Sequence, residues 1–188
     1  MQASRNNSYG FTLIELVFVI IIVAILSIVA LPKLINLDRD AHIAQLNSIA
    51  ASISAQNQLT YSKSAIAHIE HLEGCSYACG NHPNWDIRQG EYFIDASATR
   101  LYVSMGYPLP PLTSSATVNN NYRTVFGLPS TEFDFTSVTR HLSATAIVPI
   151  KWSEKLNDIK NGIFECHVEY SSPTSIRNYS VKVFTKDC

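Results

Sequence analysis

The sequence predicts an α+β protein in which one long N-terminal helix packs on an antiparallel β-sheet. Three features lead to this prediction. The stretch from Leu16 to Leu31 is apolar apart from the hydroxyl of Ser27. A helical apolar pattern continues beyond Pro32. From Glu91 onward, short runs of alternating apolar and polar residues are separated by turn residues, as in β-hairpins.

Length and charge limit the classes of protein that fit. The chain has 188 residues, enough for one domain of ordinary size and an anchor. Its formal net charge is -1, and no basic run interleaved with aromatic residues is present. The composition therefore gives no indication of nucleic-acid binding.

The apolar segment is long enough to cross a membrane. Phe11 to Leu31 matches the roughly 20 apolar residues that a helix needs to span the hydrocarbon core. Its side chains are apolar on every side of the helix, unlike the single stripe of a soluble amphipathic helix. Arg5 on the short N-terminal flank predicts that this end stays in the cytoplasm and that the C-terminal domain is exported.

One carboxylate, Glu15, lies in the first turn of this helix. Thr12 and Glu15 have the spacing of a capping box, and the helix dipole favours a negative charge there. Alternatively, Glu15 awaits a positively charged partner when helices pack together away from lipid, because a buried charge is tolerated only when it is paired. We favour the second explanation.

The ten residues Met1–Gly10 are short, polar and mildly basic. A secretory signal peptide would be cut after its apolar region, whereas the distinctive junction here, Gly10–Phe11, precedes that region. Cleavage at this junction would leave the apolar helix on the mature protein.

These features resemble the N-terminus of the type IV pilin and pseudopilin family, and the resemblance is carried by Gly10-Phe11-Thr12-Leu13-Ile14-Glu15-Leu16 and the apolar run that follows. The resemblance implies that a prepilin peptidase cuts between Gly10 and Phe11 and methylates Phe11. It also implies that Glu15 pairs with the amino group of a neighbouring subunit's Phe11 during filament assembly. The leader and Phe11 resemble the type IVa branch, whereas Ala24 departs from the glycine of many members.

Pro32 removes a backbone donor and predicts a kink or an open turn near residues 28–32. Helical periodicity resumes at once, so we do not expect the helix to end there. The sequence predicts one helix from about Thr12 to about Tyr61, whose amphipathic second half is covered by a globular domain. With Thr12 and Glu15, Pro32 is assigned to filament assembly.

Six runs are candidate strands: Glu91–Asp95, Arg100–Met105, Tyr122–Phe126, Ala144–Trp152, Ile163–Tyr170 and Tyr179–Thr185. Pro149 predicts an edge or a bend in its run. Three asparagines within residues 118–122 suit exposed turns, and Gly106–Pro111 suits a rigid loop. Aromatic residues such as Trp85 and Tyr102 are assigned to packing rather than to a ligand site.

The last two runs predict an antiparallel hairpin that brings Cys166 near Cys188. A disulfide between them would contribute roughly 3 kcal/mol in the chain-entropy model, and an exported domain permits it. This arrangement resembles the disulfide-bounded C-terminal region of type IV pilins. With Gly106-Tyr107-Pro108, it is most similar to mannose-sensitive haemagglutinin (MSHA) pilins.

The sequence does not determine the disulfide pairing of Cys75 and Cys79, because four cysteines allow three pairings. We favour a Cys75–Cys79 disulfide, which closes within its own neighbourhood. The alternative is a metal site, although the spacing is not that of a common zinc module. Its ligands would be Cys75, Cys79, His82 and either His68 or His71.

No nucleophile elbow, zinc-protease motif, P-loop or dinucleotide fingerprint occurs in the sequence. We therefore expect no catalytic residues, no cofactor, no resident metal and no enzyme activity.

We expect a cleaved leader at residues 1–10, a transmembrane and assembly helix at 11–35, and a globular head at 36–188. The resemblance implies a subunit of a type IV pilus, active in adhesion, surface attachment and motility. Its implied partners are copies of itself, other pilins, the prepilin peptidase, the inner-membrane assembly machinery and membrane lipid. Its location would be the inner membrane before assembly and the extracellular filament afterwards. The alternatives are a minor pilin, a pseudopilin of a type II secretion system, and a membrane-anchored enzyme or lectin.

Overall fold

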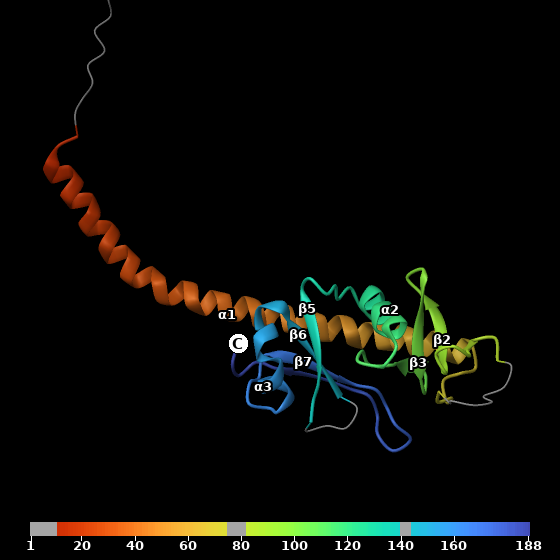
Figure 1. Ribbon diagram of the computed structural model, residues 1–188. Helices are drawn as coiled ribbons and strands as arrows, with labels where there is room; N and C mark the ends of the chain where they lie inside the picture. The colour runs from red at the N-terminus through yellow and green to blue at the C-terminus, as the bar shows by residue number, and fades with distance from the viewer. Residues whose placement is uncertain (1–10, 75–81, 140–143) are drawn as a thin grey trace, which may run out of the picture. The chain divides into compact units, whose positions relative to one another are not determined.

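The computed structural model describes residues 11–74, 82–139 and 144–188, and within helix α1 it leaves out the side chains of residues 29 and 31–36. The chain divides into two compact units, Met1–His42 and Ile43–Cys188, and each is described here by itself. Figure 1 shows an α+β chain in which one long helix, α1, is followed by strands and short helices.

Helix α1 runs from Leu13 to Ile66, so it begins and ends close to the positions that the sequence predicts. Its backbone stays helical through Pro32, and the kink expected near residues 28–32 stays a prediction. The end of α1 is a Schellman motif: His68 has a φ of 57°, and the Ile69 amide donates to the Ser64 carbonyl over 2.9 Å. This motif therefore ends the helix at Ile66.

The first sheet is antiparallel and has the order β1-β2-β3-β4. Its strands are β1 Trp85–Asp86, β2 Glu91–Ala96, β3 Thr99–Ser104 and β4 Tyr107–Pro108. Strands β2 and β3 confirm two of the predicted runs to within one residue at each end.

The second sheet is also antiparallel and has the order β5-β6-β7-β8. Its strands are β5 Phe133–Ser137, β6 Ala144–Pro149, β7 His167–Ser171 and β8 Ser180–Phe184. The prediction of a single sheet is therefore wrong. Pro149 ends β6 and is followed by the 3-10 helix η1, Ile150–Lys155, which confirms the bend and not the edge position.

The second half of α1 forms the common core of both sheets. Leu46 and Ile53 of α1 are buried in one cluster with Ile94 and Leu101 of the first sheet and Ile147 of the second. Burying such side chains stabilises a fold by about 1.5–3 kcal/mol each. The globular unit is therefore built around this half of the helix.

Each sheet is covered on its other face by a short helix. Helix α2, Ala116–Phe126, places Val118 against Phe93 and Tyr102 of the first sheet. Helix α3, Leu156–Lys160, follows η1 and packs Ile159 against Val148 of the second sheet.

Helix α2 corrects two predictions, because Tyr122–Phe126 is not a strand and the asparagines of residues 118–122 are not in a turn. The Ser115 hydroxyl accepts from the Val118 amide and caps the N-terminus, while Gly127 closes the C-terminus with a φ of 63°. Between these caps Tyr122 is buried, and it stacks on Phe126 at 4.1 Å between ring centroids.

Cys166 and Cys188 form a disulfide in the structure, with their Cα atoms 5.0 Å apart. Next to it, the Asp187 carboxylate accepts from the Glu165 amide over 2.8 Å, and the Asp187 amide donates to the Glu165 carbonyl over 3.0 Å. The disulfide and these bonds fasten the end of the chain beside the entry to β7.

Replacing both Cys166 and Cys188 by serine is expected to lower the free energy of unfolding by about 3 kcal/mol, since the loop is no longer closed in the unfolded chain. Urea unfolding of the full chain in detergent measures the loss. The single variant Cys166→Ser should lose as much as the double variant, because both remove the same bond. Unchanged stability in the double variant would show that the bond contributes nothing.

Candidate functional site

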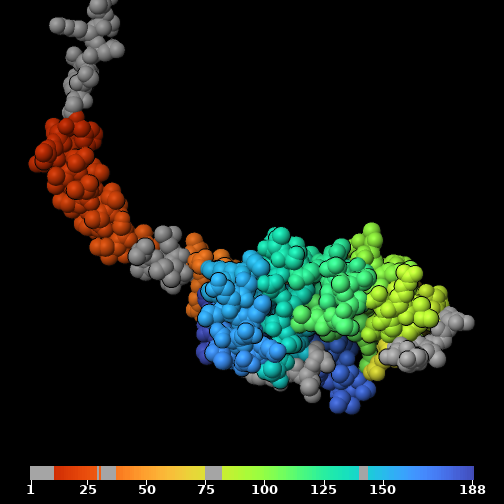
Figure 2. All heavy atoms as spheres, in the orientation of Figure 1, coloured from red at the N-terminus to blue at the C-terminus, as the bar shows by residue number. Residues whose placement is uncertain are grey.

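The first half of α1 is apolar and exposed along its described length (Figure 2). The exposed fraction is 73% at Phe11, 77% at Ile14 and 64% at Phe18. Exposure is at least 39% at the further residues Leu13, Leu16, Val17, Val19, Ile20, Ile21, Ile22, Val23, Ile25, Leu26 and Ile28. Apolar surface on this scale marks a membrane or protein interaction site.

Glu15 lies in the first turn of this segment, and its carboxylate closes a capping box with Thr12. The Thr12 hydroxyl donates to the carboxylate over 3.2 Å, and the Glu15 amide donates to the Thr12 hydroxyl over 3.4 Å. The Thr12 amide lies 3.5 Å from the same carboxylate oxygen. The carboxylate of Glu15 thus has the capping partners within its own chain that the capping-box explanation requires. Glu15 remains exposed.

The structure describes some of the predicted site residues and not others. Phe11 lies two residues before the first residue of α1, whereas Gly10, Cys75 and Cys79 lie outside the described residues. The same is true of the side chain of Pro32. No group of three or more potential metal ligands occurs among the described residues, and the two cysteines of the metal alternative are not among them. In the described part of the chain, no helix is both long and apolar enough to count as a membrane span.

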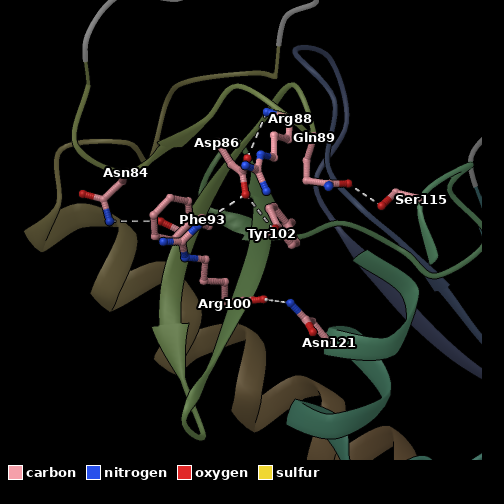
Figure 3. A network of polar contacts seen from close by, with 9 residues as sticks. All are labelled: Asn84, Asp86, Arg88, Gln89, Phe93, Arg100, Tyr102, Ser115 and Asn121. Atoms are coloured by element: carbon pink, nitrogen blue, oxygen red, sulfur yellow. Dashed lines mark hydrogen bonds and ion pairs between the residues drawn. The ribbon is translucent and has the colours of Figure 1, made fainter. Parts of the chain in front are cut away.

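A second constellation, which the sequence analysis does not predict, surrounds Asp86 at the end of β1 (Figure 3). Its carboxylate accepts from the Tyr102 hydroxyl over 2.9 Å and from the Arg88 amide over 3.0 Å. The Arg100 guanidinium lies 3.4 Å from the same carboxylate and 4.3 Å from the centre of the Phe93 ring. Asp86 thereby fixes the β1–β2 turn and the arginine of β3 together.

Electrostatics follow from this geometry. Burial by itself would raise the pKa of Asp86, but the hydrogen bonds from Tyr102 and Arg88 and the charge of Arg100 lower it overall. Burial, together with the bond to Asp86, raises the pKa of Tyr102 to about 12. Asp86 is therefore a fixed anion that holds its neighbours in place, not a proton donor or acceptor near neutral pH.

Glu91, the register partner of Asp86 on β2, is partly buried, and burial raises the pKa of its carboxyl from 4.5 to about 7. Because the folded protein holds this proton more tightly than the unfolded chain, stability falls as the pH rises from about 4.5 to about 7. Across this pH range the unaltered protein is expected to lose on the order of 2 kcal/mol of its free energy of unfolding through Glu91, and Glu91→Gln should not show this loss. Urea unfolding at several pH values measures it, with Glu154→Gln as a matched change at an exposed carboxylate. An unaltered pH profile in Glu91→Gln would contradict the assignment.

Comparison with known proteins gives one family match. Residues 5–31 match the model of the prokaryotic N-terminal methylation motif. No match was found among curated proteins or among solved structures.

The matched stretch contains the Gly10–Phe11 junction, Thr12, Glu15 and most of the exposed apolar segment. It supports a type IV pilin-like prepilin, a class of structural rather than enzymatic proteins. Such a motif implies processing by a prepilin peptidase, insertion into the inner membrane and assembly with other pilins. The α+β architecture is compatible with a pilin fold.

Proposed function

We propose that this protein is a structural subunit of an MSHA-like type IV pilus, which assembles into extracellular filaments for adhesion and surface attachment. The observation that carries the proposal is the exposed apolar first half of α1, with a single carboxylate in its first turn, inside the matched methylation motif. A surface of this kind needs either lipid or other copies of itself to cover it.

In this proposal residues 11–35 wait in the inner membrane with the N-terminus in the cytoplasm. Removal of residues 1–10 creates a new amino group at Phe11, which is then methylated. This cation supplies the partner that Glu15 needs once helices of neighbouring subunits pack together. Extraction from lipid becomes tolerable because the same apolar surface, worth about 25 cal/mol per Å² when shielded from water, is buried again against other helices.

The resulting contact is head-to-tail and does not close, which is the kind of interface that forms fibres. The second unit is then displayed along the filament, held in shape by its core and by the Cys166–Cys188 disulfide. That disulfide supports a pilin over a type II secretion pseudopilin, the alternative machine for the same N-terminal segment. Labelling surface filaments with an antibody to this chain separates a major subunit, labelled along its length, from a minor one, labelled sparsely.

Mass spectrometry of the protein from assembled filaments is expected to show that residues 1–10 are absent and that Phe11 carries one methyl group. The physical reason is that only cleavage between Gly10 and Phe11 frees the amine that pairs with Glu15. A matched sample from cells without prepilin peptidase should retain Met1 and lack the methyl group. Filament protein that still begins at Met1 would remove the proposal.

A further inference from the structure

An open depression of about 710 Å³ lies on the first sheet beside α2, wholly within the second unit. Its wall includes Trp85 and Asp86 of β1, Arg88 and Gln89 of the following turn, and Arg100 of β3. Thr117 and Asn121 of α2 line its remaining side. The wall is mostly polar, which disfavours an apolar small molecule as the natural occupant.

The charged groups of this depression are not equally available. The carboxylate of Asp86 already accepts from the Tyr102 hydroxyl and the Arg88 amide, and it lies beside the guanidinium of Arg100. The side chain of Arg88 is exposed, and the described residues offer its guanidinium no ion pair. Arg100 is 55% exposed, and only one of its nitrogens reaches Asp86. Asp95 of β2, the register partner of Arg100, also lines the depression and is exposed, so its carboxylate can accept from the hydroxyl groups of an occupant. Two guanidinium groups can donate into the depression, while the carboxylate of Asp86 is already satisfied.

The remaining polar groups suit hydroxyl recognition. Asn121 donates from its amide nitrogen to the Arg100 carbonyl over 2.9 Å, which leaves its side-chain oxygen available. Gln89 accepts from the Ser115 hydroxyl with its oxygen, which leaves its NH₂ group available (Figure 3). Trp85 is half-buried, and its ring packs edge-on against the buried Tyr92 at 5.0 Å between ring centroids, so it is part of the core and not a surface for an occupant.

We infer that this depression binds an anionic saccharide, a sugar whose carboxylate meets Arg88 and Arg100 while its hydroxyl groups meet Gln89 and Asn121. Guanidinium groups match a planar carboxylate with paired, charge-assisted hydrogen bonds. Asp86 is a positioning residue, because it holds Arg100 and the Arg88 turn in place. The site needs only residues 83–121, so it does not depend on filament assembly.

Calorimetric titration of the full chain in detergent micelles with trigalacturonate tests the inference. Binding should weaken at least about tenfold when the carboxylates are methyl-esterified, because the shape is kept and the charge is lost. Arg88→Gln should weaken binding at least about tenfold, since its backbone amide still bonds Asp86 and the turn is preserved. Lys160→Gln removes the same charge from an exposed position on α3 and should leave binding unchanged.

Three outcomes would overturn the inference. The first is the absence of binding by the unaltered chain. The second is equal binding of the acid and its methyl ester, or equal effects of Arg88→Gln and Lys160→Gln, which would make the attraction unspecific. The third is displacement of trigalacturonate by an equal concentration of acetate, which would show a site for any small carboxylate and not for a sugar.

Discussion

Glu15→Gln is expected to reduce incorporation into filaments at least about tenfold while the protein remains stable, membrane-inserted and cleaved. Glutamine keeps the hydrogen bonds of the capping box, because the motif accepts glutamate or glutamine at this position. It removes only the negative charge, so the amine of the neighbouring Phe11 is left buried and unpaired in the filament. The measurement is the ratio of sheared filament protein to cell-associated protein.

Thr12→Ala provides the matched control, because it breaks the capping box and leaves the charge of Glu15 intact. In the structure Thr12 supplies the hydroxyl that accepts from the Glu15 amide and donates to its carboxylate. If capping is the whole function of Glu15, Glu15→Gln, which keeps the capping box, will assemble normally and Thr12→Ala will assemble poorly. If the charge is what matters, Thr12→Ala will assemble far better than Glu15→Gln.

Elements with strong local signals could be predicted from the sequence. The apolar run and the pattern from Leu34 to Ile53 suffice for α1, because a helix is set by contacts three and four residues apart. Strands β2 and β3 have alternating residues and a tight connection, so their positions also follow from local sequence. The proximity of Cys166 to Cys188 follows from a hairpin of two alternating runs, which β7 and β8 form.

Helix α2 shows how a local signal can be misinterpreted. Its buried residues Val118, Tyr122 and Phe126 recur every four positions, which is a helical spacing. The asparagines between them favour turns, and the aromatic ending resembles a strand. Burial against the first sheet outweighs both preferences. Strand β5 was missed since Phe133–Ser137 is short and is defined by its pairing with β6.

The two candidate sites also differ in how far local sequence predicts their contacts. Thr12 and Glu15 are three residues apart, so the sequence alone brings them together. Asp86 meets Arg100 and Tyr102 across 14 and 16 residues, and only the pairing of β1, β2 and β3 places them side by side. Arg100 and Tyr102 do alternate with Leu101 along one strand, which assigns them to one face but does not identify Asp86 as their partner.

Gly106→Ala is expected to lower the free energy of unfolding by about 4 kcal/mol. Gly106 has a φ of 79°, a conformation that costs an alanine about 1–2 kcal/mol. The added Cβ would lie 2.9 Å from Cδ2 of Tyr61 on α1 and 3.1 Å from the backbone of Glu70. Such overpacking costs about 1–3 kcal/mol more. Urea unfolding of the full chain in detergent measures the sum.

Gly127→Ala separates the two contributions, because Gly127 also has a positive φ, 63°, but an added Cβ there meets nothing within 4 Å. It should therefore lose only the cost of the backbone conformation, about 1–2 kcal/mol. The difference between the two variants measures how tightly β4 is held against α1, where Tyr107 also packs on Tyr61 at 5.1 Å between ring centroids. Equal losses in the two variants would mean that Tyr61 moves aside and that this seam is loosely packed. We expect Gly106→Ala to lose more stability than Gly127→Ala, because Gly106 lies close to both α1 and the backbone of residue 70. The backbone of residue 70 cannot move aside without disturbing the hydrogen-bonded turn that contains it.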